Sequence, residues 1–293
     1  MTAFGNFEAL CDAIGIDPPN RKLMFLGAGN MTMALVEGCL KSGFAQNHHI
    51  ALSCKTEATK NKWKTLHGFD VYLDNKDMIA ASPKGILIFA TKPQTFSDVF
   101  VALPCIDQIS LVISLMTGIS YNELNEKLKL RKCHCPIVRL CPNTPCAVGA
   151  GASLISSAKD TPENKLNIAR AIARSVGMYQ EVPENIYNAA QAVSGCGPAW
   201  TYMFIESLAD GGVLSGLTRE QAMKLAAQTV MGAAKMVLES GEHPGALKDK
   251  VCSPAGTTIQ GVRELEKQGF RYGVMEAVKA ATNRAEQLNS KKE

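Results

Sequence analysis

The glycine-rich segment LMFLGAGNMTMALVEGCL contains the first residues of the sequence whose spacing points to chemistry. Gly27 and Gly29 supply two glycines of a G-x-G-x-x-G pattern, and Thr32 stands where the third is expected. The first glycine permits a tight turn, the second lets backbone approach a phosphate, and the third serves helix packing. Thr32 followed by the small Ala34 meets that packing requirement with altered spacing. Because a strand enters the turn and a helix over 31–39 leaves it, the segment predicts a pyrophosphate site; a plain tight turn is the alternative.

The end of the second predicted strand, LSCKTEAT, bears on the choice of dinucleotide. Sites for NAD usually place an acid there to bond the ribose hydroxyls. Between Ser53 and Thr56 there is no acid, and Ser53, Lys55 and Thr56 suit a 2′-phosphate. We therefore expect NADPH to be favoured over NADH; a solvated surface charge is the alternative role for Lys55.

The ten cysteines are too dilute in a chain of 293 residues for a disulfide framework, and no C-x-x-C pair occurs. Reduced thiols in a cytoplasmic compartment fit better. Cys133, His134, Cys135 and Cys141 offer soft ligands that suit zinc. However, Cys133 and Cys135 share one face of an extended segment, and no second well-spaced pair completes a tetrahedral site. We expect no metal.

These residues need a framework, and short apolar runs in the first half predict one. The runs have the composition of buried strands and are separated by polar stretches with helical periodicity, such as 56–67 and 119–130. Alternation of this kind predicts a parallel sheet with helices on both faces. The predicted strands are LMFLG, IALSC, VYL, GILIFAT, LVISL and PIVRL.

The pattern of alternating predicted strands and helices ends near SSAKDTPENK. Thr161 can cap a helix there, with Pro162 at its first position, and long helices then dominate. We therefore predict an N-terminal extension over 1–21, a dinucleotide-binding domain over 22–160 and a helical domain over 161–293.

The helical half contains two clear apolar stripes. Thr218 and Gln221 form a capping box at the start of the first. A single layer of such helices cannot cover both faces, so we expect a twofold partner. The stripes comprise Ala222, Leu225, Ala226, Thr229, Val230, Ala233, Met236 and Val237, then Phe270, Val274, Ala277, Val278, Ala281, Ala285 and Leu288.

Composition excludes several classes of protein. An apolar content of 46% with 20% charged residues is typical of a globular chain, and the net charge of +4 is scattered without a basic block, so we expect no nucleic acid partner. No apolar run approaches the ~18 residues of a membrane span.

The first twenty residues lack Lys and Arg, which argues against a targeting segment. Phe7, Leu10, Cys11 and Ile14 instead predict a short amphipathic helix docked on the body.

Four segments together resemble a known family. FATKPQ, RLCPNTPCAVGAGA, VSGCGPAW and HPGALKDKVCSPAGTTIQGVRELEKQGFR occur in the order and positions seen in pyrroline-5-carboxylate reductase. The resemblance runs from Lys22 almost to the carboxyl end. It implies an α/β fold, with a Rossmann-like dinucleotide-binding domain followed by an all-α dimerisation domain. It also implies reduction of 1-pyrroline-5-carboxylate to L-proline with NADPH or NADH, the last step of proline biosynthesis, by a homodimer that in many members assembles into a decamer.

The resemblance also implies residue roles. The pyrophosphate loop, the contacts around the adenosine phosphate, a strand-end turn beside the dinucleotide and a turn at the nicotinamide can each be placed by position. They are, in that order, Gly27, Gly29, Asn30 and Met31; Ser53 and Asn75; Thr91, Lys92 and Pro93; and Asn143, Thr144 and Pro145.

The segment SPAGTT resembles the substrate loop of the family. Small residues before a helix expose backbone amides that can hold a carboxylate without an arginine; a plain helix cap is the alternative. The family usually has a second glycine where this chain has Ala255, and Tyr or Phe where it has Trp200. The implied substrate-binding residues are Ser253, Ala255, Gly256, Thr257 and Thr258.

The chemistry requires little acid or base catalysis. A cyclic imine accepts hydride once its nitrogen is protonated, so the enzyme chiefly has to position the reacting carbons. Thr258 can orient the ring nitrogen, and we expect it to be the catalytic residue. Glu206 can offset the iminium charge if it faces the pocket, although a surface acid is the simpler role.

Two other functions remain open from the sequence. A beta-hydroxyacid dehydrogenase needs a lysine on the helix after SGCGPA, but none occurs between Ala199 and Leu217. A non-catalytic NADP-binding protein would explain Ala255 as an early loss. Retention of Thr258 and of the cofactor glycines argues against it.

Overall fold

The computed structural model describes residues 5–290 and contains two compact units. The first comprises the chain up to Cys196 together with the carboxyl-terminal segment from Ala281, and the second comprises Gly197–Ala280. Each unit has its own architecture.

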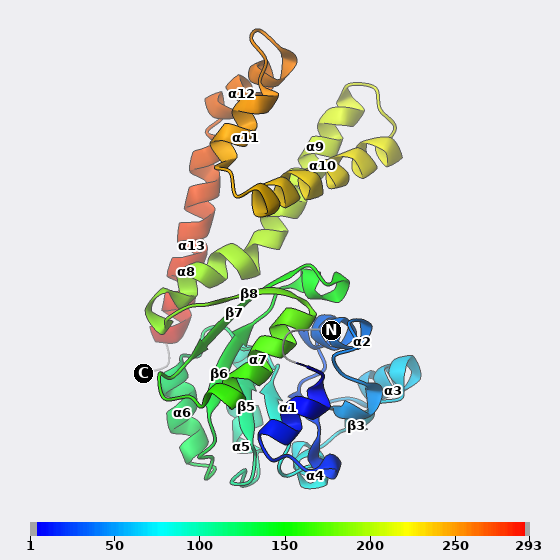
Figure 1. Ribbon diagram of the computed structural model, residues 1–293, viewed down its shortest axis with the longest axis vertical. Coiled ribbons are helices and arrows are strands. Elements are labelled where there is room, and N and C mark those ends of the chain that lie inside the picture. Colours follow the sequence, from blue (N-terminus) through cyan, green and yellow to red (C-terminus); the bar gives the residue numbers. More distant parts are fainter. Residues whose placement is uncertain (1–4, 291–293) are drawn as a thin grey trace. The chain divides into compact units, whose positions relative to one another are not determined.

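The first unit is built on a sheet of eight strands within the described residues, in the order β3-β2-β1-β4-β5-β6-β7-β8 (Figure 1). Neighbours are parallel except β6 and β7, which are antiparallel. All six predicted strands are confirmed. The strands are β1 Leu23–Leu26, β2 Ile50–Ser53, β3 Asp70–Tyr72, β4 Ile86–Phe89, β5 Leu111–Ser114, β6 Ile137–Cys141, β7 Gly151–Ser157 and β8 Gly177–Glu181.

The central strands are buried on both faces, because alternate side chains enter two separate apolar cores. In β1, Leu23 and Phe25 face one core, and Met24 and Leu26 face the other. The first core is covered by α1 Phe7–Ala13, α2 Asn30–Lys41, α3 Glu57–His67 and α7 Glu163–Ser175; the second is covered by α4 Asn75–Ala81, α5 Phe96–Val101 and α6 Tyr121–Lys129.

The N-terminal segment is part of this unit and not a separate extension. Phe7 is fully buried, its backbone N–H donates to the Phe44 carbonyl at 3.1 Å, and its ring lies 5.0 Å from that of His49. The predicted amphipathic helix is therefore confirmed as α1. Three short 3₁₀ turns, η1 Pro18–Asn20, η2 Asn47–His49 and η3 Pro93–Thr95, link elements of the same unit.

The predicted boundary at 160/161 falls inside the first unit. The α7 helix buries its apolar face against the sheet, and β8 pairs with β7, so the unit continues to Cys196. The predicted cap at Thr161 is also wrong. Pro162 itself is the N-cap, with an extended backbone (ψ 134°), and the helix begins one residue later without a side-chain cap.

The turn after β6 is fixed by close backbone packing. This turn, η4 Thr144–Val148, meets Gly38 of α2 so tightly that a Cβ on Gly38 would lie 2.5 Å from the Cys146 carbonyl oxygen and 2.6 Å from Val176. A Cβ on Gly151 would lie 2.3 Å from the Cys146 sulfur. Glycine is thus required on both sides of η4, because backbone cannot give way as a flexible side chain can.

An ion pair between a buried arginine and an exposed glutamate holds the last elements of the first unit, which are η5 Glu184–Ile186, α8 Tyr187–Gln191 and the π-helical η6 Ala192–Cys196. Arg139 of β6 is 2% exposed, pairs with Glu184 and stacks on the Tyr187 ring at 3.7 Å from its centroid. Burial raises the pKa of Tyr187 well above its usual value. Removing Glu184 would leave the buried Arg139 without its counter-charge, which is strongly destabilising, whereas Glu184 itself is 40% exposed.

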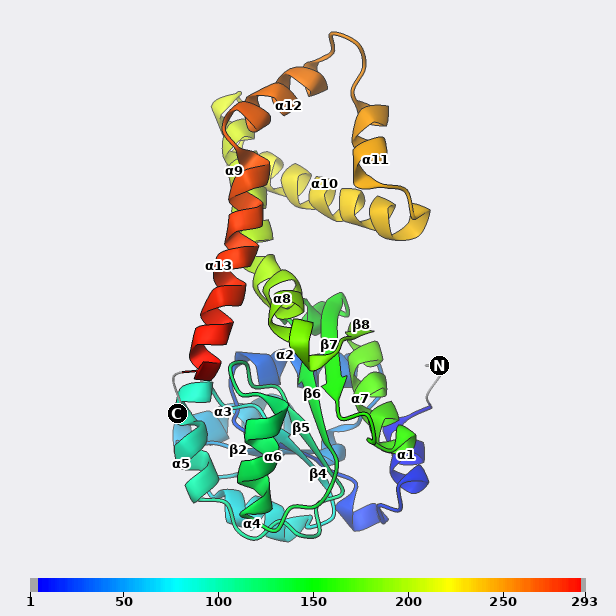
Figure 2. The ribbon, with the colours of Figure 1, turned by 90° about the vertical axis from the view of Figure 1, so that its left-hand side faces the viewer.

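The second unit is helical (Figure 2). Its elements are α9 Gly197–Leu214, α10 Arg219–Ser240, α11 Pro244–Val251, α12 Thr257–Lys267 and the first half of α13 Phe270–Ser290. The predicted capping box is confirmed, since Gln221 N–H donates to the Thr218 hydroxyl at 3.3 Å. Close contact between α9 and α10 uses Ala209, Ala222 and Ala226.

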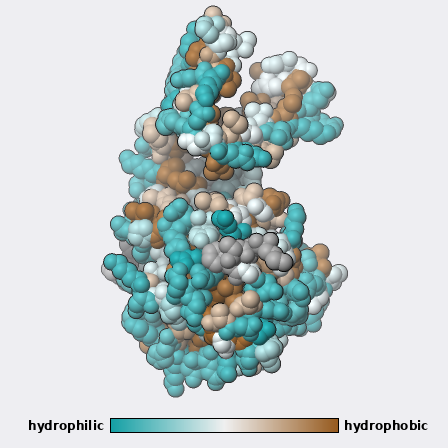
Figure 3. Space-filling model, viewed as in Figure 1, coloured by the Kyte–Doolittle hydropathy of each residue, from teal (hydrophilic) through white to brown (hydrophobic). Residues whose placement is uncertain are grey.

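The helical unit leaves much apolar surface uncovered, as the brown side chains of its helices in Figure 3 show. Leu225 is 59% exposed and Leu238 is 79% exposed. An apolar groove of about 740 Å³ lies among α9, α12 and α13, lined by Trp200, Met203, Phe204, Ser207, Leu208, Leu265, Phe270, Gly273, Val274 and Ala277. Among the described residues, no helix has the length and apolar content needed to cross a membrane.

Candidate functional site

The turn between β1 and α2 has the geometry of a phosphate site. Gly27 has φ +111°, and a Cβ there would lie 3.0 Å from the Ala90 carbonyl oxygen and 3.2 Å from Thr91. Gly29, by contrast, has open space where its Cβ would be. The first glycine is thus required by the protein itself, and the second leaves room for a ligand next to the backbone.

Two side chains hold the carbonyl groups of this turn toward the protein. The buried Thr32 hydroxyl donates to the Gly27 carbonyl at 2.8 Å, and the buried Trp63 indole donates to the Ala28 carbonyl at 3.3 Å. With these carbonyl oxygens occupied, the amino end of the twelve-residue α2 can present its positive dipole end to an anion. Thr32 therefore does more than the predicted packing. Trp63 was not predicted, and a lone aromatic residue in an amphipathic helix gave no signal of this role.

An open cavity of about 420 Å³ lies beside the turn. It brings together five of the predicted cofactor residues: Gly29, Asn30, Met31, Thr91 and Lys92. It also contains Ala90, Leu115, Met116 and Thr117, which the sequence analysis missed. Leu115, Met116 and Thr117 follow the buried strand β5. Their position in the sequence could have indicated this role, because ligands bind beyond the carboxyl ends of parallel strands.

The predicted adenosine residues lie along the same sheet edge, after β2 and β3. Gly27 N–H donates to the Ser53 carbonyl at 3.1 Å, so the end of β2 adjoins the turn. However, Ser53 is 3% exposed and its hydroxyl donates to the Phe25 carbonyl at 3.4 Å. Lys55 is exposed, and Asn75, the first residue of α4, is half-buried. A charged group beyond β2 would therefore meet Lys55 rather than the Ser53 hydroxyl.

Asn143 is bound within the protein. Its side-chain amide donates to the Ser194 carbonyl at 2.9 Å and accepts from the Ala152 N–H at 2.9 Å, and the residue is 6% exposed. It joins the start of η4 to β7 and to the π-helical η6. These two bonds fix the turn, and they use one of the two amide N–H groups and one of the two oxygen lone pairs of the side chain.

The predicted substrate loop lies between α11 and α12 in the helical unit. Gly256 is the N-cap of α12, and no side chain caps this helix. Thr257 and Thr258 occupy its first turn, where backbone N–H groups have no partner within a helix. Thr258 is exposed, and its hydroxyl makes no hydrogen bond to the rest of the described chain. These groups can together receive a carboxylate and a neighbouring polar atom.

Two residues of this loop are under steric constraint. A Cβ on Gly256 would lie 2.3 Å from the Ser253 hydroxyl. Ala255 adopts φ +57°, the left-handed conformation that costs a residue with a Cβ roughly 1–2 kcal/mol. The loop therefore keeps the conformation suited to the glycine of the family, even though alanine stands there.

Two other residues singled out from the sequence lie on α9. Glu206 is exposed, with no contact that ties it to the substrate loop. Trp200 lines the apolar groove of the helical unit.

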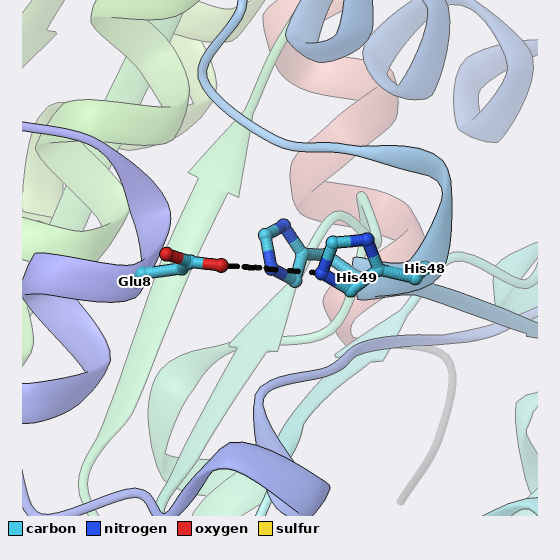
Figure 4. Close-up of side chains that lie close together, drawn as sticks. All are labelled: Glu8, His48 and His49. Atoms are coloured by element: carbon cyan, nitrogen blue, oxygen red, sulfur yellow. Dashed lines mark ion pairs between the residues drawn. The ribbon is translucent and has the colours of Figure 1, made fainter.

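The candidate metal ligands among the cysteines do not form one set. The sulfur atoms of Cys133 and Cys135 lie 3.4 Å apart, but Cys141 packs in another core with Tyr187. Glu8, His48 and His49 come closest to a ligand set within residues 5–290 (Figure 4).

The hydrogen bonds of His49 oppose a metal at this second cluster. Its Nδ1 accepts the Gln46 N–H at 3.1 Å, so the proton of the neutral ring is on Nε2, which faces the Glu8 carboxylate at 3.3 Å. A metal-binding histidine normally donates through its other nitrogen. Burial lowers the pKa of His49 and keeps it neutral. The cluster thus ties α1 to η2.

Comparison with known proteins agrees with this geometry. A family model described as NADP oxidoreductase coenzyme F420-dependent matches residues 22–118, and one described as pyrroline-5-carboxylate reductase dimerisation matches 184–288. The sheet unit with its phosphate turn, followed by a helical unit, defines an NAD(P)-dependent oxidoreductase.

Relatives identify the family within this class. The pyrroline-5-carboxylate reductase of Methanosarcina acetivorans is 41% identical, over 93% of this chain and 99% of its own. The pyrroline-5-carboxylate reductase of Pisum sativum is 39% identical, over 91% and 96%. The crystal structure of Plasmodium falciparum pyrroline carboxylate reductase with NADP bound has a TM-score of 0.82 and 32% identity, and covers 93% of this chain and 99% of that one. The chain belongs to the pyrroline-5-carboxylate reductase family, which confirms the resemblance, the fold class and the cofactor class.

The hydrogen bond from Thr32 to the turn can be tested directly. Thr32→Val keeps the shape of the side chain but leaves the Gly27 carbonyl without its partner, a loss of about 1–3 kcal/mol. We expect the Kd for NADPH, measured by fluorescence titration, to rise roughly tenfold. Thr32→Ser retains the hydroxyl and should stay near the wild type. An unchanged Kd in Thr32→Val would show that the turn holds its shape without this bond.

Proposed function

We propose that this chain reduces 1-pyrroline-5-carboxylate to L-proline with NADPH. The observation that carries the proposal is the uncapped amino end of α12, where the free amides and the unpaired Thr258 hydroxyl match a small cyclic imine bearing a carboxylate. The sheet unit supports it with a phosphate turn and an adjoining cavity. Family membership makes this substrate the first to test.

In this proposal the cofactor runs along the carboxyl ends of the parallel strands. The pyrophosphate lies at Gly29, Asn30 and Met31, and the adenosine lies over β2 and β3 near Lys55 and Asn75. Thr91, Lys92 and Pro93, which follow β4, together with Met116 and Thr117, border the nicotinamide side. Asn143 positions η4 next to them through its two hydrogen bonds.

The substrate is held by the loop from Ser253 to Thr258. The first amides of α12 bind the carboxylate, and the Thr258 hydroxyl orients the ring nitrogen. NADPH supplies the hydride, and protonation of the imine makes its carbon the acceptor. The protein thus contributes chiefly by positioning, which requires neither a nucleophile nor a buried acid.

Hydroxyacid oxidation is the competing function, and α9 lacks the residue that it needs. This helix carries Glu206 and Asp210 but no lysine. A direct comparison decides between the two: the purified chain should consume NADPH with 1-pyrroline-5-carboxylate and should not reduce NADP with beta-hydroxyacids. Turnover of a hydroxyacid without turnover of the imine would overturn the proposal.

The role of Thr258 predicts a defined loss of activity. Thr258→Ala removes a hydrogen bond to a charged group, worth about 1.5–3 kcal/mol. We expect kcat/KM for the imine to fall roughly tenfold to a hundredfold, with little change in NADPH affinity. Thr258→Ser should recover much of the loss. Unaltered efficiency in Thr258→Ala would remove this residue from the site, and a parallel loss of NADPH binding would assign it to the fold instead.

Selectivity for NADPH is predicted to depend on Lys55. Lys55→Glu places a like charge beside the 2′-phosphate and should lower kcat/KM with NADPH roughly tenfold, while NADH is affected little. Lys41→Glu makes the same charge change at the far end of α2, where Lys41 is exposed, and serves as the control. Equal losses with both cofactors, or none, would show that Lys55 does not contact the phosphate.

The exposed apolar faces of the helical unit predict the assembly. The chain is expected to form a homodimer through α9, α10 and α13, and the dimers to assemble further, as the family resemblance implies. Light scattering should show no stable monomer at micromolar concentration. Leu225→Glu should weaken the assembly, whereas Leu130→Glu, on the surface of the sheet unit at 76% exposure, should not. A fully active monomer would contradict the assignment.

The cysteines bear on where the reaction takes place. All ten are free, and thiols persist in reducing compartments. This supports the cytoplasm as the site of the reaction.

A further inference from the structure

The segment between α6 and β6 contains a pair of thiols for which the reductase reaction has no use. The sulfur atoms of Cys133 and Cys135 lie 3.4 Å apart, within hydrogen-bonding distance. His134, between them, is exposed. Among the ten cysteines, all of which lie in the described part of the chain, this is the one pair whose sulfur atoms lie within hydrogen-bonding distance of each other.

The local fold brings the two sulfur atoms together. Lys132 has φ +57° and reverses the chain at the end of α6, and Cys133 N–H then donates to the Leu128 carbonyl at 3.2 Å. Pro136 follows and favours an extended conformation at Cys135. The side chains of a residue and its second neighbour lie on one side of an extended segment, so the thiols face each other.

The thiol contact also distinguishes Cys133 chemically. The hydrogen bond from Cys135 lowers the pKa of Cys133, and the same bond raises that of Cys135. Burial, in contrast, raises the pKa of the thiols of Cys11, Cys39, Cys54, Cys141 and Cys146. Thiolate character and a neighbouring thiol are the two features of a redox-active cysteine pair.

We propose that Cys133 and Cys135 form a dithiol site that a small hydroperoxide oxidises to an intramolecular disulfide. Size selects the oxidant, because Cys133 is only 5% exposed and a bulky disulfide reagent would not reach its sulfur. The sulfur atoms have to approach by little more than an ångström to reach the bond length of about 2.05 Å.

The reaction balances with one molecule of peroxide. The Cys133 thiolate attacks one peroxide oxygen, the O–O bond breaks, and Cys133 becomes a sulfenic acid while hydroxide takes up a proton as water. Cys135 sulfur then attacks the Cys133 sulfur. The S–S bond forms, the S–O bond breaks, and the departing hydroxide takes the Cys135 proton as a second water. Two thiols are oxidised and one peroxide is reduced.

The site is remote from the cofactor turn within the sheet unit. Cys135 precedes β6, at the strand end opposite to the edge that carries Gly29 and Thr91. Disulfide formation is therefore expected to leave NADPH binding unchanged.

Peptide mass spectrometry of the native, full-length protein tests the proposal. Trypsin releases both cysteines, and no others, in the peptide CHCPIVR. After limited hydrogen peroxide and alkylation of free thiols, we expect this peptide to be lighter by two hydrogen atoms than the reduced peptide and to carry no alkyl group. Dithiothreitol before alkylation should restore two alkyl groups.

Two single-cysteine variants test whether the disulfide forms between Cys133 and Cys135 and not with another thiol. Cys105→Ser removes an exposed lone cysteine and should leave disulfide formation in CHCPIVR intact. Cys135→Ser should leave Cys133 as a sulfenic acid, which dimedone traps when the peroxide is first removed and the protein is then denatured in the presence of the probe. The proposal is overturned if CHCPIVR stays doubly alkylated while Cys105 is oxidised, or if its cysteines form disulfides only with other peptides.

Discussion

The cofactor site depends on how two backbone carbonyl groups are held. The Thr32 hydroxyl and the Trp63 indole bind the carbonyl oxygens of Gly27 and Ala28 on the protein side of the turn. Carbonyl oxygens directed at a phosphate would repel it, whereas the amino end of a helix attracts it. The turn is also constrained by the end of β4, because the backbone of Gly27 lies too close to it to leave room for a side chain. The turn is thus tied to α2 through Thr32, to α3 through Trp63 and to the end of β4 through Gly27.

The proposed function divides binding between the two units, with the cofactor assigned to the sheet unit and the substrate to the helical unit. The sheet unit is closely packed around the turn after β6, where glycines on α2 and β7 admit close backbone contact and Asn143 joins η4 to η6. The helical unit carries the loop assigned to the substrate, in which Ala255 keeps the left-handed conformation of a glycine. Backbone strain of this kind persists only where the surrounding structure enforces it. The helical unit also leaves apolar helix faces exposed, in keeping with the dimerisation model that the chain matches.

Much of this could be predicted from the sequence, because strands buried on both faces are continuous apolar runs and the family motifs are long. The cofactor glycines and TKP were predicted in this way. Three features were out of reach. The helix α7 and strand β8 belong with the sheet through long-range pairing that local periodicity does not encode. Trp63 and Asn143 act through hydrogen bonds to distant backbone. The Ser53 hydroxyl is turned into the sheet, although its position in the sequence suggested a phosphate contact.

The central claim is that the nicotinamide held beside this turn passes its hydride to the carbon of a cyclic imine. The most direct measurement uses NADPH labelled with deuterium at the carbon that gives up the hydride. With 1-pyrroline-5-carboxylate and the purified chain, the account predicts L-proline carrying one deuterium at the former imine carbon, from one of the two diastereomeric labels only. Proline without deuterium from either label, or cofactor oxidation without proline, would contradict it.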